Sequence, residues 1–199
     1  MTTFYLVRHG ENDFLGRGLA GRTPGVSLNA VGRRQAEAVA ERLASVGVTH
    51  VVTSPLERTR ETAAPLAARL GLAPEVEAGV LEVDFAEWTG ASWDDLDADP
   101  RWGHFNRFRA SVRPPGGGEL SGEVQARFVG ALLRLCEAHP DGRVAVFSHG
   151  DPIRVALAHF LGVPLDWILR FEIDPGSVSA VEVGEDWARV LYVNDLVAR

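Results

Sequence analysis

The stretch Thr3-Phe4-Tyr5-Leu6-Val7-Arg8-His9-Gly10 sets the fold of this 199-residue chain. Its apolar residues form a short run that ends in polar ones, which is the pattern of a buried strand. Residues 48–53 and 143–148 show the same pattern, and residues 36–43 and 124–135 carry apolar side chains at helical spacing. Strands that alternate with helices predict an α/β fold, a three-layer sandwich in which helices flank a mostly parallel central sheet.

The remaining segments predict a single domain over residues 1–199. No internal repeat occurs, and the linker-like stretch Pro114-Pro115-Gly116-Gly117-Gly118 is too short to separate domains. Residues 178–183 and 189–193 resemble two more strands that form a closing hairpin. Residues 85–120 are rich in Trp, Phe and Arg. We expect them to form a small lid or insertion that sorts leaving groups, or else a satellite core with solvated Arg side chains.

Two helix N-termini can be recognised from the sequence. Ser54-Pro55-Leu56-Glu57 combines a capping Ser, a Pro and an acidic residue three positions on, which predicts a capping box. Asp151-Pro152 repeats the cap and the Pro directly after residues 143–148. Pro65 is expected to kink or shorten the first of these helices. Both helix starts follow strands, where their positive dipole ends would favour an anion.

The composition excludes several classes of function. A formal charge of −7 argues against a nucleic-acid partner. All 20 basic residues are Arg, and without Lys the chain cannot be a P-loop NTPase or form a Schiff base. No apolar run approaches the roughly 20 residues of a membrane helix, and the start has no basic leader, so we expect a cytoplasmic protein that does not bind membranes. We also expect no metal and no cofactor.

Three polar side chains stand at expected strand ends: His9 after the first strand, Arg58 near the start of the helix after the second, and His149 after residues 143–148. Arg8 joins them by adjacency. In open α/β sheets, ligands bind beyond the carboxyl ends of the strands, so these side chains are expected to share one crevice. The four other His residues do not precede a Gly at a strand end, and we assign them structural or solvated roles.

These residue types suit phosphoryl transfer. A phosphoryl group spreads negative charge over three oxygens in its transition state. Guanidinium groups and fixed N–H donors are needed to stabilise this charge. Gly10 and Gly150, which follow the two His residues, would let the backbone approach such an anion. A neutral imidazole is a competent nucleophile, and neighbouring Arg cations keep His9 neutral. A carboxyl group with a raised pKa can then protonate the leaving alkoxide.

Four ordered motifs resemble those of the histidine phosphatase, or phosphoglycerate-mutase-like, superfamily: Leu6-Val7-Arg8-His9-Gly10-Glu11, Ser54-Pro55-Leu56-Glu57-Arg58-Thr59-Arg60-Glu61-Thr62-Ala63, Leu81-Glu82-Val83-Asp84-Phe85-Ala86-Glu87-Trp88-Thr89-Gly90 and Ser148-His149-Gly150. The resemblance implies that His9 is the phosphorylated nucleophile and Glu82 the proton donor, with Asp84 as the alternative acid. It implies a phosphate pocket made by Arg8, Arg58 and His149.

The resemblance also implies substrate contacts from Asn12 and the loop Ala20-Gly21-Arg22-Thr23, chiefly Gly21 and Arg22, and from Gly150. Two positions depart from the family pattern. Ala86 stands where relatives usually have Gly, and Leu120 stands where they usually have Ser. Neither belongs to the expected phosphate pocket, so the departures bear on substrate contacts.

The sequence therefore predicts a metal-independent phosphomonoester hydrolase of the histidine acid phosphatase type, with a small phosphorylated substrate and, if the chain self-associates, a homodimer. Cofactor-dependent phosphoglycerate mutase activity is an alternative, although the basic-aromatic run that follows the acid in such enzymes is missing after Glu82. A non-catalytic phospho-ligand binder is a second alternative. A serine hydrolase at Ser148 is a third, but Val146 occupies the position where a nucleophile elbow needs Gly. The physiological substrate stays open.

Overall fold

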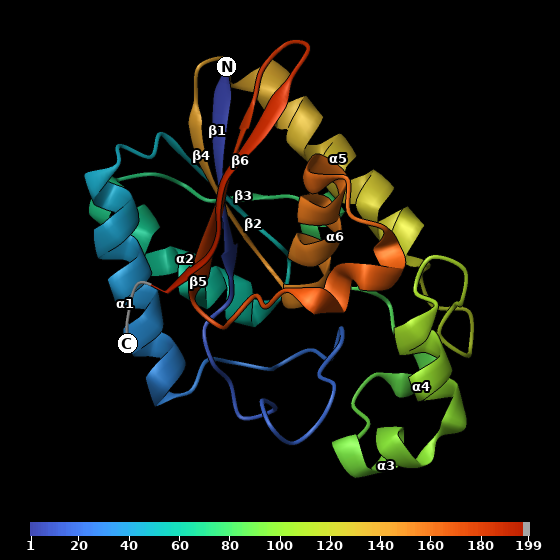
Figure 1. Cartoon of the computed structure of the whole chain (residues 1–199). Helices are drawn as coiled ribbons and strands as arrows, with labels where there is room; N and C mark the ends of the chain where they lie inside the picture. Colours follow the sequence, from blue (N-terminus) through green and yellow to red (C-terminus); the bar gives the residue numbers. More distant parts are fainter. Residues whose placement is uncertain (197–199) are drawn as a thin grey trace.

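The structure is a computed structural model, and it describes residues 1–196. Six strands form one mixed sheet in the order β3-β2-β4-β1-β5-β6 (Figure 1). Strands β1 to β4 pair in parallel, whereas β5 pairs antiparallel with β1 and β6 antiparallel with β5. The predicted α/β fold and the closing hairpin are thus confirmed. The strands are β1 Thr2–Arg8, β2 His50–Thr53, β3 Glu75–Val76, β4 Arg143–Ser148, β5 Ser177–Val183 and β6 Ala188–Leu196.

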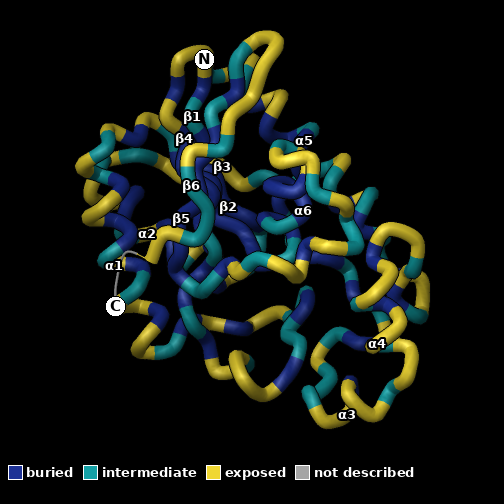
Figure 2. Tube along the Cα trace, viewed as in Figure 1, coloured by how far each residue is buried: buried dark blue, intermediate teal, exposed yellow. Residues whose placement is uncertain are grey.

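Helices cover both faces of the sheet, with α1 and α2 on one side and α5 and α6 on the other (Figure 1). Strand side chains alternate between the faces. Tyr5 and Val7 pack with α1 and α2, and Phe4 and Leu6 pack with α5 and α6. The central strands are accordingly the most buried part of the chain (Figure 2). The helices are α1 Ala30–Ser45, α2 Glu57–Leu70, α5 Ser121–Ala138 and α6 Gly150–Leu161.

Residues 85–120 form a satellite core beside the sheet. Phe85, Trp88 and Phe105 are buried in a cluster with Val155 of α6 and Ile168. Its short helices lie beyond the ends of the parallel strands, at the lower right of Figure 1. They are η2 Ala86–Trp88, α3 Trp93–Ala98 and α4 Pro100–Arg107. Outside this region, η1 Ala78–Val80 contacts α5 and β4, and η3 Leu165–Arg170 contacts α4 and α6.

Two predictions about helix starts were wrong. Helix α2 begins at Glu57 rather than after Ser54, because the Ser54 hydroxyl contacts His149 instead of the helix backbone. Helix α6 begins at Gly150, and the Asp151 carboxylate binds Arg side chains instead of capping the helix. In both cases a residue that is distant in sequence binds the side chain that could have capped the helix.

Pro65 was expected to kink or shorten α2. The helix is not shortened, because it continues to Leu70.

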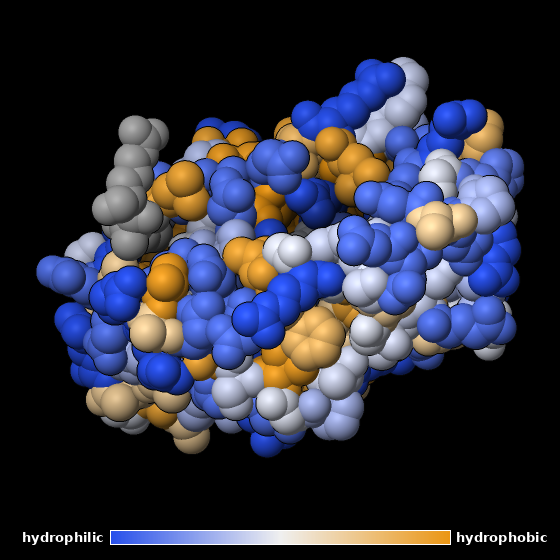
Figure 3. Space-filling model, turned by 90° about the horizontal axis from the view of Figure 1, so that it is seen from below, coloured by the Kyte–Doolittle hydropathy of each residue, from blue (hydrophilic) through white to orange (hydrophobic). Residues whose placement is uncertain are grey.

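The face at which β1, β2 and β4 end is largely hydrophilic, with small groups of hydrophobic side chains among the polar ones (Figure 3). Among the helices described in residues 1–196, none combines the length and the apolar character needed to cross a bilayer.

Candidate active site

The ends of β1 and β4 bring the two candidate histidines together. Arg8 pairs with Ser148 in the parallel register, and the His9 backbone N–H donates to the Ser148 carbonyl at 3.0 Å. The rings of His9 and His149 then lie edge to face, with their centroids 5.3 Å apart. Next to them is a cavity of about 110 Å³, which we call the phosphate cavity. Its lining includes Arg8, His9, Asn12, Gly21, Arg58 and Glu82.

His9 is held in one tautomer. Its Nδ1 lies 2.8 Å from the Gly10 carbonyl oxygen. Because a carbonyl oxygen can only accept, Nδ1 carries the proton and Nε2 carries the lone pair. Burial, and then the charges of Arg58 and Arg8, hold the pKa of His9 well below its usual value. His9 is therefore a neutral imidazole with an unprotonated Nε2, which is the form that can attack phosphorus.

Several buried N–H groups around His9 have no hydrogen-bond acceptor. Arg8 uses Nη1 to bind the Ile173 carbonyl, and Arg58 uses Nη2 to bind the Gly21 carbonyl. Within residues 1–196, four buried nitrogens of the site have no hydrogen-bond partner: Arg8 Nε, Arg58 Nε, Arg58 Nη1 and His149 Nδ1. We call these four atoms the open donors. Leaving such groups unpaired costs about 1–3 kcal/mol each, so their gathering indicates a site for a ligand with several acceptor oxygens.

Ser54 determines how His149 presents its ring. The Ser54 hydroxyl lies 2.8 Å from His149 Nε2, and both side chains are fully buried. Burial, and then the charges of Arg58, His9 and Arg8, lower the pKa of His149 well below its usual value. When the Ser54 hydroxyl donates to Nε2 of this neutral ring, the ring proton is on Nδ1. His149 then donates from Nδ1 toward the ligand.

Glu82 supplies the carboxyl group of the site. Its side chain is 13% exposed, and Oε2 lies 3.9 Å from His149 Nδ1. Burial first, and then the negative charge of Asp151, raise the pKa of Glu82 to about 7, against the opposing effect of Arg58. A carboxyl group with this pKa can hold a proton near neutral pH and also release it.

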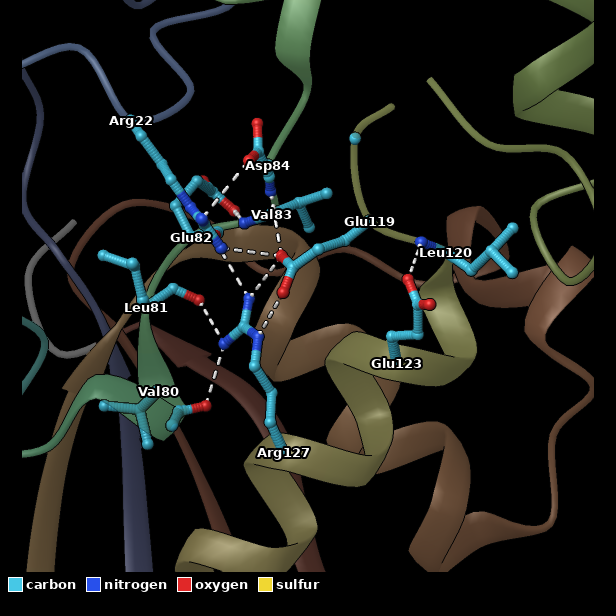
Figure 4. Close-up of polar contacts among 12 residues, drawn as sticks. Arg22, Val80, Leu81, Glu82, Val83, Asp84, Glu119, Leu120, Glu123 and Arg127 are labelled. Atoms are coloured by element: carbon cyan, nitrogen blue, oxygen red, sulfur yellow. Dashed lines mark hydrogen bonds and ion pairs between the residues drawn. The ribbon is translucent and has the colours of Figure 1, made fainter. Parts of the chain in front are cut away.

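A network of hydrogen bonds fixes the backbone on either side of Glu82 (Figure 4). Arg22 Nε and Arg127 Nη2 both donate to the Glu82 carbonyl, at 2.9 and 3.1 Å. The Glu119 carboxylate accepts from Arg22 Nη2 at 2.7 Å, from Arg127 Nε at 2.9 Å and from the Asp84 backbone N–H at 2.9 Å. We call Arg22, Glu119 and Arg127 the acid-loop clamp. Arg22, which was expected at the substrate mouth, thus lies in this clamp and does not line the phosphate cavity.

The other expected substrate contacts lie at or near the phosphate cavity. Asn12 and Gly21 line it, and Gly21 adopts a positive φ of 51° while its carbonyl binds Arg58. A Cβ on Gly150 would lie 3.4 Å from Arg8 Nε, so this glycine leaves room beside the guanidinium. Gly10 has a different role from the one expected. Its N–H donates to the Thr62 hydroxyl, and a Cβ there would lie 2.6 Å from the Gly32 carbonyl oxygen.

The sequence reasoning missed Ser54 and Thr62 as partners of the site, together with Glu119 and Arg127. Ser54 and Thr62 both belong to the second motif, which was the available signal for them. Asp84, the alternative acid, accepts from the Ala86 N–H and faces Arg22 at 3.5 Å rather than lining the cavity. Over residues 1–196, the His, Cys, Asp and Glu side chains form no group of three or more that could hold a metal ion.

Comparisons with known proteins agree with this geometry. A bifunctional protein of Mycobacterium tuberculosis is 33% identical over 195 residues, which cover 94% of this chain and 52% of that protein, so the chain spans about half the length of this relative. The probable phosphoglycerate mutase GpmB of Klebsiella pneumoniae is 32% identical over 187 residues, covering 92% of this chain and 85% of that protein. A mycobacterial glucosyl-3-phosphoglycerate phosphatase, solved with VO3, superposes with a TM-score of 0.88 at 27% identity, covering 97% of this chain and 99% of that one.

The family model described as the histidine phosphatase superfamily (branch 1) matches residues 4–196. The match includes all four motifs and each residue that lines the phosphate cavity. The chain therefore belongs to the histidine phosphatase superfamily.

Proposed function

We propose that the protein is a metal-independent phosphomonoester hydrolase that works through a phosphohistidine on His9. The single observation that carries this proposal is the set of open donors around a neutral His9. A phosphoryl group has three non-bridging oxygens, and the two guanidinium groups with His149 offer four N–H donors to them. The mycobacterial phosphatase that was solved with VO3 supports the same class of reaction.

The reaction has two steps. Nε2 of His9 attacks phosphorus and forms an N–P bond while the P–O bond to the alcohol breaks, and Glu82 gives its proton to the departing oxygen. The Glu82 carboxylate then takes a proton from a water molecule as that water attacks the phosphohistidine. The N–P bond breaks, phosphate leaves, and His9 and Glu82 return to their starting protonation states. Throughout, Arg8, Arg58 and His149 stabilise the charge on the phosphoryl oxygens.

Hydrolysis of p-nitrophenyl phosphate tests this proposal. We expect turnover that survives EDTA and that vanadate inhibits, because vanadate can adopt the five-coordinate geometry of the transferring phosphoryl group. His9→Ala should lose essentially all turnover and keep its circular dichroism spectrum and melting temperature. Loss of activity in EDTA with recovery on adding a divalent metal would contradict the proposal, as would a His9→Ala enzyme with a near-normal rate.

Phosphoglycerate mutase activity is a second candidate, favoured by the 32% identity to the probable mutase GpmB. Both activities would share the phosphohistidine and differ in the acceptor, which is water in a phosphatase and a second phosphoglycerate hydroxyl in a mutase. Phosphorus NMR of 3-phosphoglycerate incubated with the enzyme separates them. A phosphatase releases inorganic phosphate, whereas a mutase primed with 2,3-bisphosphoglycerate forms 2-phosphoglycerate without net release.

A further inference from the structure

A second cavity, of about 280 Å³, adjoins the phosphate cavity. The two share Arg8, Leu19, Glu82 and Trp93 in their linings. A proton donor must reach the ester oxygen, so the alcohol part of a substrate begins beside Glu82. The second cavity extends from this position, and we call it the leaving-group cavity. Its lining also includes Phe85, Trp102, Asn106, Arg109, Asp151 and Arg154.

One wall of the leaving-group cavity is aromatic. The rings of Trp93 and Trp102 have their centroids 6.4 Å apart. Trp102 is supported from behind, because its ring packs against Trp88 at 5.2 Å and stacks with Phe105 at 5.8 Å. Rings held in this way offer broad apolar surfaces at a low cost in conformational entropy. Such a wall suits a ligand that has a flat or gently puckered ring.

The lining also carries charged side chains that pair with one another. The Asp151 carboxylate accepts from Arg109 Nη1 and, at 3.0 Å, from Arg154 Nη1. Arg154 Nη2 also donates to Glu172 at 2.9 Å. Although burial opposes ionisation, the charges of Arg109 and Arg154 bring the pKa of Asp151 to about 2. Glu172 is exposed and does not line the cavity, so Arg109 and Arg154 share one carboxylate within the lining, that of Asp151.

The same part of the lining also has N–H groups that are not paired with a carboxylate. Arg109 is 4% exposed, and its Nε is buried with no hydrogen-bond partner among residues 1–196. Asn106 accepts from Arg109 Nη2 with its Oδ1, so it can present its amide N–H2 group to a ligand. These N–H groups suit hydroxyl and ring oxygens.

We infer that the leaving-group cavity selects phosphate monoesters of ring-containing polyhydroxy alcohols over those of open-chain polyhydroxy alcohols. The apolar face of the ring packs on Trp93 and Trp102, and its oxygens accept from Arg109 and Asn106. This inference rests on the proposed phosphatase function and names the substrate class for it.

Two six-carbon substrates with the same primary phosphate test the inference. Glucose 6-phosphate has a ring, and sorbitol 6-phosphate is an open chain of the same charge. We expect kcat/KM to be about tenfold higher for glucose 6-phosphate. Equal values for the two, a preference for the open chain, or no turnover of glucose 6-phosphate would each overturn the inference.

Two substitutions locate the effect. Trp102→Leu should lower the ratio of kcat/KM for glucose 6-phosphate over sorbitol 6-phosphate several-fold, and Trp93→Leu provides the same test if Trp102→Leu does not fold. Trp187→Leu, at an exposed position between β5 and β6, is the matched control and should leave the ratio unchanged.

Unchanged ratios in these variants would contradict the inference even if the wild-type order is as expected. Hydrolysis of p-nitrophenyl phosphate by the same preparations distinguishes a failure of the inference from a failure of the proposed function. If p-nitrophenyl phosphate is hydrolysed and the two six-carbon substrates are not discriminated, only the inference fails. If p-nitrophenyl phosphate is not hydrolysed, the proposed function itself fails.

Discussion

Burial acts on His9 and Glu82 in opposite directions. It disfavours the charged form of each group, and so it lowers the pKa of His9 and raises that of Glu82 to about 7. The charges of Arg8 and Arg58 keep His9 neutral as well. Near neutral pH, one group can therefore be an unprotonated nucleophile while the other holds its proton. These are the two states that the first step of phosphoryl transfer needs.

At Glu82, the expected effect of a substitution depends on the leaving group. Glu82→Gln removes the proton donor, and general acid catalysis contributes about 10²–10⁴-fold. An alkoxide needs that proton, whereas p-nitrophenolate leaves without it. We therefore expect Glu82→Gln to slow alkyl phosphates far more than p-nitrophenyl phosphate. For the wild type, kcat/KM on an alkyl phosphate should fall as the pH rises above about 7, and Glu82→Gln should flatten this limb.

Equal losses on the two kinds of substrate would mean that Glu82 only positions a neighbour such as His149. The same pair of substrates would then be applied to Asp84→Asn. The structure argues against Asp84, because its carboxylate accepts from the Ala86 N–H and faces Arg22.

Among the structural elements, the loop that carries Glu82 is held in position by the acid-loop clamp. Arg127 comes from α5 and also donates to the Gly79 and Leu81 carbonyls, at 2.8 and 2.7 Å. Arg22 comes from the loop whose Gly21 carbonyl binds Arg58. Glu119 joins these two cations, and so one carboxylate links the phosphate pocket to the proton donor.

Glu119→Gln should weaken the clamp and let Glu82 move. A misplacement of about 1 Å can cost ~10²-fold in rate, so we expect kcat on an alkyl phosphate to fall by roughly 10- to 100-fold with little change in KM. Because Glu119 acts through Glu82, the loss on p-nitrophenyl phosphate should be much smaller. Glu123→Gln, four residues further on in the first turn of α5, is the matched control, since Glu123 pairs with the exposed Arg113. Equal losses on both substrates, or an equal effect of Glu123→Gln, would contradict a positioning role.

The departures at Ala86 and Leu120 have local explanations. Ala86 has a φ of 46°, in the left-handed region where Gly is favoured, which accounts for the Gly of its relatives. Leu120 is the N-cap of α5 and makes no side-chain capping bond, whereas its N–H donates to Glu123 at 2.8 Å. A Ser at this position would add a capping hydroxyl.

Ala86→Gly should stabilise the protein by about 1 kcal/mol, because it relieves the left-handed strain of an L side chain. Urea denaturation should show this as a higher midpoint with an unchanged slope. The control is Ala64→Gly at an exposed position inside α2, which should destabilise by about 1 kcal/mol. A loss of stability in Ala86→Gly comparable with that of the control would show that the positive φ carries no strain.

For the molecule as a whole, the sequence was informative where one local pattern decides the structure. The apolar runs before His9 and His149 predicted β1 and β4, and polar residues at the strand ends predicted which side chains would meet. The pattern was misleading where a side chain had two competing partners. Ser54 can cap a helix or bind His149, and Asp151 can cap a helix or bind Arg109 and Arg154. Only the packing of distant elements decides such cases.

The same reason explains why Arg22 was expected at the substrate mouth. Its loop does border the phosphate cavity through Gly21, but the next side chain along the chain points to Glu119, which is 97 residues away in sequence. No spacing within the loop predicts that contact. The sequence pointed to residues 85–120 as a region that could sort leaving groups, but it did not show the rest of the leaving-group cavity, whose lining also comes from segments as distant as Arg8 and Leu169.

The most direct test of the account is to locate the covalent intermediate. Wild-type enzyme mixed with a phosphate monoester and quenched in alkali, where phosphohistidine survives, is digested and mapped by mass spectrometry. The account predicts a phosphoryl group on His9, at Nε2, which appears within one turnover and is absent from His9→Ala. A phosphoryl group on His149 or Ser148, or full turnover with no phosphoenzyme at any time, would contradict it.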